Sequence, residues 1–257
     1  MRPCLLVVAA CAILAREAAA QSLAERVRSA KDDNVVFHFT PRAGVCGDGR
    51  SFVRMGHSYQ GSFNSGDYSR PCEPGPVQVQ LTLRNGEVEG VQAWVGRMRA
   101  RDAQDLGTVP APEAARYLLS IAASGRSSAS AKAIFPAVLA DSATVWPALL
   151  TIAKDRDGRS RQTREDASFW LSRFAAGAID GRPNQPFDDD DDGTDSKDDL
   201  KSHAVFVLSQ LPHGEGIPNL LDVVRSRADV RVRGKALFWL GQSGDPRALE
   251  LFEALLK

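Results

Sequence analysis

The feature that most constrains the fold is an internal repeat in the C-terminal half of the chain. Residues 235–240 (KALFWL) resemble residues 203–208 (HAVFVL), 32 positions earlier, and residues 166–171 (DASFWL) lie a further 37 positions back. A weaker copy occupies residues 132–135, another 34 positions back. Apolar residues in these copies recur at three- and four-residue spacing, which indicates helices with one buried face. A repeat of this period predicts stacked supersecondary units.

A second block of sequence recurs with the same spacing. Residues 146–150 (WPALL) match residues 217–221 (IPNLL) at an offset of 71, which also separates Ala133 from Ala204. Each unit is therefore predicted to be two helices joined by a turn. The clearest turn is residues 244–246 (GDP), in which Asp is the expected N-cap and Pro the first helical residue. One hairpin cannot bury its own apolar face, so neighbouring units must stack to complete the core.

Residues 234–252 (GKALFWLGQSGDPRALELF) resemble a HEAT repeat of the short, phycobilisome-lyase-like kind. The resemblance extends over residues 199–257 and, more loosely, over residues 129–174. It implies an α-solenoid used as a protein-binding surface, whereas no constellation of residues for handling a chromophore is seen. Because adjacent helical residues diverge by about 100°, we expect Trp170 and Trp239 to form an exposed interaction stripe. The alternative is that these aromatic side chains belong to the core.

The preceding region has strand patterns instead. Residues 35–39 (VVFHF) are β-branched or aromatic, and residues 77–83 and 88–95 flank Asn85-Gly86, a pair typical of a two-residue hairpin turn. The expected fold class is therefore α+β, with a small antiparallel β-domain followed by an all-α HEAT-like solenoid.

Four segments are predicted along the chain. Residues 1–20 form a signal peptide, residues 21–105 a β-rich domain with a short N-terminal helix, and residues 106–257 the helical repeats, which carry an acidic insertion at residues 181–199. Arg2, an apolar run and three alanines at 18–20 are typical of an export signal cleaved before Gln21. We therefore expect a periplasmic or extracellular protein. A buried first helix, or a lipoprotein cleavage box ending at Cys11, are the alternatives.

Export leaves Cys46 and Cys72 as the cysteine pair of the mature chain. In an oxidising compartment these two residues are expected to form one disulfide. The alternative is a metal site with His38 and His57, but the isolated cysteines do not match a zinc knuckle.

The insertion contains a calcium-loop pattern. Residues 188–199 hold eight Asp and one Lys, and they read as a twelve-residue loop with Gly193 at its sixth position. The expected oxygen ligands follow the EF-hand order, with Thr194 contributing its backbone carbonyl: Asp188, Asp190, Asp192, Thr194 and Asp199. The alternative is a solvated, self-repelling loop that binds no ion.

The charge balance and the absence of known motifs exclude several classes of function. The chain has 32 Lys+Arg and 32 Asp+Glu, which argues against nucleic-acid binding through bulk charge, and no apolar run is long enough for a transmembrane helix. Metalloprotease, phosphate-loop and dinucleotide motifs do not occur. We therefore expect a non-enzymatic protein that binds another protein. The alternatives are a hydrolase-type enzyme with a site around His38, His57 and Asp67, or a calcium-responsive binding module.

Overall fold

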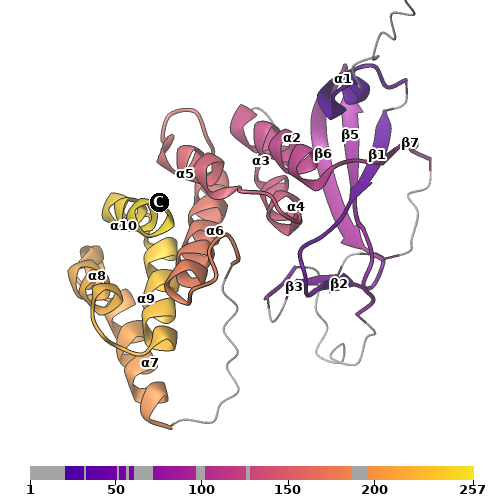
Figure 1. Ribbon diagram of the computed structural model, residues 1–257. Helices are drawn as coiled ribbons and strands as arrows, with labels where there is room; N and C mark the ends of the chain where they lie inside the picture. Colours follow the sequence, from indigo (N-terminus) through magenta and orange to yellow (C-terminus); the bar gives the residue numbers. More distant parts are fainter. Residues whose placement is uncertain are drawn as a thin grey trace, which may run out of the picture.

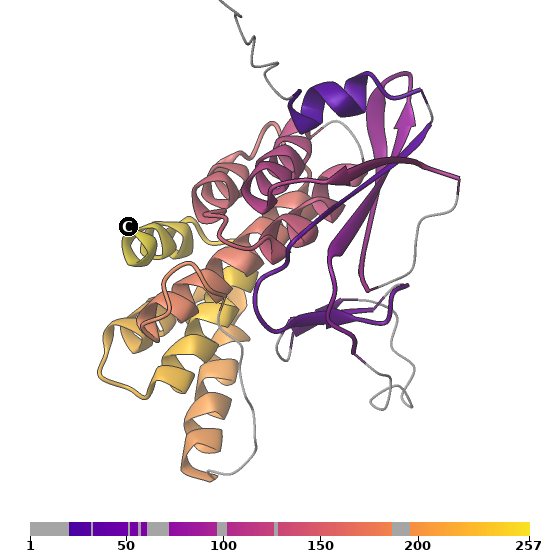
Figure 2. The ribbon, with the colours of Figure 1, turned by 45° about the vertical axis from the view of Figure 1, so that its right-hand side comes forward.

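The computed structural model describes residues 21–31, 33–50, 52–55, 58–60, 72–96, 102–125, 128–186 and 196–257. A β-rich N-terminal part and a helical C-terminal part lie side by side (Figures 1 and 2), so the class is α+β. A short helix, α1 (Leu23–Arg28), precedes a four-stranded sheet of order β6-β5-β1-β7 and a three-stranded sheet of order β2-β3-β4. The strands are β1 (Asn34–Phe39), β2 (Val45–Gly47), β3 (Val53–Met55), β4 (Ser58–Gln60), β5 (Val77–Arg84), β6 (Glu87–Val95) and β7 (Gln104–Thr108).

The predicted hairpin is confirmed in β5 and β6. Asn85 and Gly86 have φ angles of 53° and 78°, the left-handed conformation that a two-residue hairpin turn requires. Alternate residues of β5, from Val77 to Leu83, are buried on one face of the sheet, as the period-two pattern predicts.

The large sheet is mixed, so the expectation of a purely antiparallel domain is wrong. β7 pairs in parallel with β1, while β5 and β6 are antiparallel to their neighbours. The sequence of β7 (QDLGT) lacks apolar alternation, so its pattern does not predict a strand. The strand forms because it satisfies the backbone groups along the second edge of β1. As a result, the predicted division between residues 105 and 106 falls inside a strand.

The predicted disulfide between Cys46 and Cys72 is confirmed. It links β2 to the segment that pairs beside it, where Gly47 and Glu73 form a β-bridge. A Cβ at Gly47 would lie 2.6 Å from the carbonyl oxygen of Phe52 and 2.7 Å from that of Val95. Only glycine therefore allows the small sheet to approach the end of β6 this closely.

The helical part begins against the sheet, where α3 packs on β6 and α4 on β5. α3 and α4 are one helix interrupted at Ala133, because Pro136 lacks the N–H that would continue the helical bonding. The helices are α2 (Ala111–Ser124), α3 (Ala129–Lys132), α4 (Ile134–Leu139), α5 (Trp146–Lys154), α6 (Arg161–Ile179), α7 (Ser196–Ser209), α8 (Ile217–Arg225), α9 (Val230–Ser243) and α10 (Pro246–Leu256). Among the described residues, no helix is long and apolar enough to cross a membrane.

The last six helices do not pack in chain order. α5 pairs with α6 and α8 pairs with α9, but α6 and α7 both have α9 as their main neighbour. In Figure 1, α9 accordingly lies between α6 and α7, and α10 lies against α5 and α6. The C-terminal hairpin thus occupies the middle of the helical part, and α7 and α8 form its far end.

Arg42 joins the two parts of the chain. Its guanidinium donates hydrogen bonds to the backbone carbonyls of Val138, Ala143 and Asn184, and lies 5.6 Å from the ring centre of Phe174. The buried apolar residues correspondingly form one continuous core from α1 to α10.

Candidate functional site

Aromatic side chains at equivalent repeat positions form a ladder across the helices. Phe135 of α4 contacts Trp170 of α6 with ring centres 5.5 Å apart, and Phe206 of α7 contacts Trp239 of α9 at 5.3 Å. Both contacts join the Phe of one repeat to the Trp of the next repeat in the sequence. We call the side of each helix that carries this Phe its leading face.

One junction breaks this pattern. Phe169 of α6 contacts Phe238 of α9, with ring centres 6.1 Å apart, and Gly241 of α9 lies against Ser172 of α6. Each of these pairs joins equivalent positions, 69 residues apart. Two leading faces therefore pack against each other here, and the leading face of α6 is no longer available to α7.

The consequence is an uncovered apolar surface on α7. Val207 is the α7 residue at the position of Trp170 and Trp239, and it is 47% exposed; Leu211, two residues beyond the end of α7, is 37% exposed. Ala204, which is also exposed, lies on the same side of α7 as Val207, since residues three apart share one side of a helix. We call Ala204, Val207 and the Leu211 that follows the helix the α7 outer face. Within the described part of the chain, the large hydrophobic residues classed as exposed are Phe206, Val207 and Leu211.

The two predicted interaction residues have different environments. Trp170 is only 7% exposed, so the expectation that it lies on an exposed stripe is wrong. Phe135 of α4, in the preceding repeat, stacks against its ring, and the sequence does not predict this contact. Trp239 is partly buried and packs against Phe206, at the edge of the α7 surface. Sequence reasoning missed Val207 and Leu211, although residues 204–208 (AVFVL) are apolar all round, a signal for contacts on two faces.

Most of the predicted calcium ligands lie outside the described residues. These are Asp188, Asp190, Asp192 and Thr194, while Asp199 lies in α7 with its side chain not described. The calcium site therefore stays a prediction. The alternative enzyme site is incomplete in the same way: His38 lies on β1 with its Nδ1 3.9 Å from an Asp105 oxygen, and His57 and Asp67 are outside the described residues.

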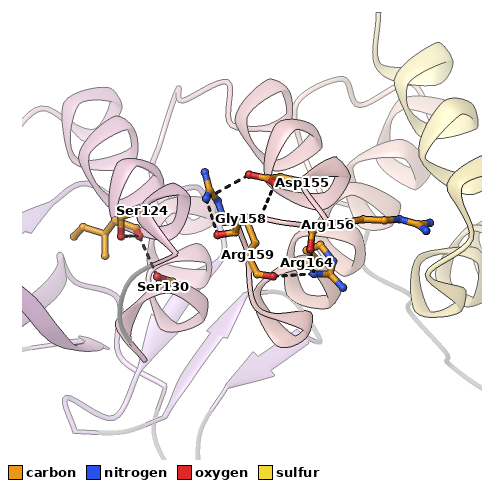
Figure 3. Close-up of polar contacts among 8 residues, drawn as sticks. Ser124, Ser130, Asp155, Arg156, Gly158, Arg159 and Arg164 are labelled. Atoms are coloured by element: carbon orange, nitrogen blue, oxygen red, sulfur yellow. Dashed lines mark hydrogen bonds and ion pairs between the residues drawn. The ribbon is translucent and has the colours of Figure 1, made fainter.

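A polar pocket opens between the hairpins α5–α6 and α9–α10, with a volume of about 500 Å³. The turn that follows α5 forms one of its walls. Figure 3 shows how this turn is held: Arg159 pairs with Asp155 at 3.3 Å, and the Asp155 carboxylate accepts a bond from the Gly158 amide. The Arg164 guanidinium donates to the carbonyl oxygens of Arg156 and Arg159, at 3.2 and 2.8 Å. The backbone of the turn is therefore rigidly connected to α6.

Two carboxylates beside this pocket have shifted pKa values. Burial, reinforced by the neighbouring charge of Glu165, raises the pKa of Asp166 to about 6. Hydrogen bonds from Lys154 and Lys257 lower the pKa of Glu253 to about 2. Lys154 therefore already has a carboxylate counter-ion, Glu253.

Comparison with protein-family models identifies residues 232–257 as a match to the PBS lyase HEAT-like repeat, and the N-terminal part matches no family model. The comparison with curated proteins and the comparison with solved structures gave no match. The matched residues comprise α10 and nearly all of α9. The resemblance predicted from the sequence is therefore confirmed for the C-terminal hairpin, which is similar to a PBS lyase HEAT-like repeat.

Proposed function

We propose that this chain is an exported, non-enzymatic interaction protein, whose helical part acts as a short HEAT-like solenoid and binds another protein through the α7 outer face. The repeat match supports the general role, because HEAT-like repeats commonly present binding surfaces. The observation that carries the proposal is the exposure of Val207 on α7 and of Leu211 just after it, because the equivalents α6 and α9 are covered by a Phe at the position of Val207.

The packing of the other repeats suggests what the partner presents. At the position of Val207, Trp170 and Trp239 each receive a Phe from a neighbouring helix. The partner is therefore an amphipathic helix with an aromatic residue on its apolar face. Asp198 and Asp199 lie in the first turn of α7 and six more Asp precede them in residues 188–195, so basic residues on the partner favour association by charge complementarity.

Site-specific photocrosslinking in intact cells tests this function. A photoreactive phenylalanine analogue at position 207 is expected to give one dominant protein adduct, identified by mass spectrometry. The matched control places the analogue at Asn219, an exposed residue of α8. Serine at position 211 should weaken the adduct while helicity by circular dichroism is unchanged. Identical adduct patterns from positions 207 and 219 would exclude the α7 outer face as the binding surface.

Export has a separate test. The N-terminal sequence of the protein recovered outside the cytoplasm should begin at Gln21, as the alanine-rich cleavage pattern predicts. A chain that retains Met1 and stays with the cytoplasmic fraction contradicts this part of the proposal.

A further inference from the structure

The pocket between the two hairpins carries charge that the protein itself does not neutralise. Its charged lining residues are Lys154, Arg156, Arg161, Arg164, Glu165 and Glu250. Arg161 donates to Glu165 at 2.6 Å, and Lys154 pairs with Glu253 outside the lining. These pairs account for two of the four cations.

The other two cations are both arginines. Within the described residues Arg164 has no carboxylate partner, whereas Arg156 interacts through its charge with the Asp245 carboxylate. The structure records no hydrogen bond or ion pair for the Arg156 guanidinium, and Figure 3 shows this side chain extending from the turn toward the C-terminal helices. Arg164 bonds only to backbone carbonyl oxygens, which fix its guanidinium without cancelling its charge. Because one nitrogen of Arg164 is anchored, its position is set before any ligand arrives.

Glu250 opposes these two arginines from α10. It also lines the pocket and has no recorded hydrogen bond or ion pair. The Asp245 carboxylate near Arg156 already accepts hydrogen bonds from the Arg247 guanidinium. Arg156 and Arg164 against Glu250 therefore leave the pocket with net positive charge. Guanidinium groups bind oxyanions through paired, charge-assisted hydrogen bonds, which suit a ligand with several acceptor oxygens.

We propose that the pocket between α5–α6 and α9–α10 binds an oxyanion, a phosphate or a carboxylate, between Arg156 and Arg164. The turn after α5 supplies Arg156, α6 supplies the anchored Arg164, and the α9–α10 turn with Ser243 and Gly244 closes the opposite side. The negative charge of Glu250 repels the bound anion, so it lowers the affinity of the pocket for the anion and favours its release. This site is distant in the sequence from the α7 outer face and does not depend on the function proposed for that surface.

Titration of the full chain by two-dimensional amide NMR tests the proposal, with inorganic phosphate, acetate and an end-blocked tetra-aspartate peptide as separate probes at constant ionic strength. Saturable shifts at Ser243 and Gly244 are expected with phosphate. The acetate and peptide arms show whether free carboxylate, or the carboxylate of an acidic segment, is also accepted. Absence of saturable shifts at these two amides with all three probes overturns the proposal.

Two variants are expected to change the affinity in opposite directions, and a third serves as a control. Arg156→Gln should weaken binding at least about tenfold through loss of a charge-assisted contact, whereas Glu250→Gln should tighten it about threefold by removing the opposing charge. Damage to the fold cannot produce the second effect. Arg227→Gln is the matched control, because Arg227 is exposed in the turn between α8 and α9, outside the pocket. Equal weakening by Arg156→Gln and Arg227→Gln would overturn the proposal, since it would mean that anions bind to general surface charge.

Discussion

Gly241 provides the most direct test of the observed helix order. A Cβ at this position would lie 2.7 Å from the Cβ and Oγ of Ser172 and 3.1 Å from the Ser168 carbonyl oxygen. The Ser168 oxygen is an α6 backbone atom and the Ser172 Cβ is attached to that backbone, so a larger side chain forces α6 and α9 apart. Overpacking of this kind lowers the free energy of unfolding by about 1–3 kcal/mol. Valine has a better helix propensity than glycine, which offsets about 0.4 kcal/mol of this loss. We therefore expect Gly241→Val to lower the free energy of unfolding by about 2 kcal/mol.

Urea unfolding followed by far-ultraviolet circular dichroism measures this loss. Gln242→Val is the matched control, because it adds the same side chain at the next, exposed position of α9. Ser172→Gly in the Gly241→Val background should recover most of the loss, since it removes the side chain that the valine meets. If Gly241→Val and Gln242→Val unfold at the same midpoint, α9 does not pack on α6 and the helices stack in chain order instead.

Three further predictions concern the rest of the chain. Arg42→Ala should lower the free energy of unfolding by about 2–3 kcal/mol, since it leaves three backbone carbonyls of the helical part without their donor from the β-rich part; thermal unfolding beside Arg42→Lys, which should recover only part of the loss, checks it. Asp166 has its pKa raised from 3.8 to about 6 in the fold, so the folded state favours the protonated form and its stability falls as pH rises through this window. Asp166→Asn should remove that slope and be more stable than the natural chain at neutral pH, as urea midpoints across the window would show; an unchanged slope contradicts the assignment. Replacing Cys46 and Cys72 by Ser should cost about 3 kcal/mol, and reductant should lower the unfolding midpoint of the natural chain but not that of the variant.

Local features were predictable where nearby residues determine them. Asn85-Gly86 sets the hairpin because both positions adopt positive φ, and Asp245 caps α10 by accepting from the Arg247 amide, as the Asp-Pro pair suggested. The disulfide followed from counting the two cysteines that remain after residue 20. These results depend on short-range geometry or on a single possible pairing.

The order of the helices could not be predicted in the same way. α6, α7 and α9 carry Phe at equivalent positions, so the repeat pattern does not say which two of them pack together. The choice depends on the close approach that Gly241 permits against Ser172. The exposure of Val207 follows from that choice of neighbours, and the candidate surface on α7 was missed for this reason. The burial of Trp170 depends instead on its contact with Phe135 of α4.

The place of α9 between α6 and α7 also determines when the helical part can fold during synthesis. α6, α7 and α8 leave the ribosome before α9, and until then the Phe169 side of α6 and the Phe206 side of α7 have no partner helix. Repeat proteins that pack in chain order can add each unit to a finished one as it emerges. In this protein the α9–α10 hairpin completes the centre, so the nascent chain exposes both apolar surfaces until that hairpin has been made.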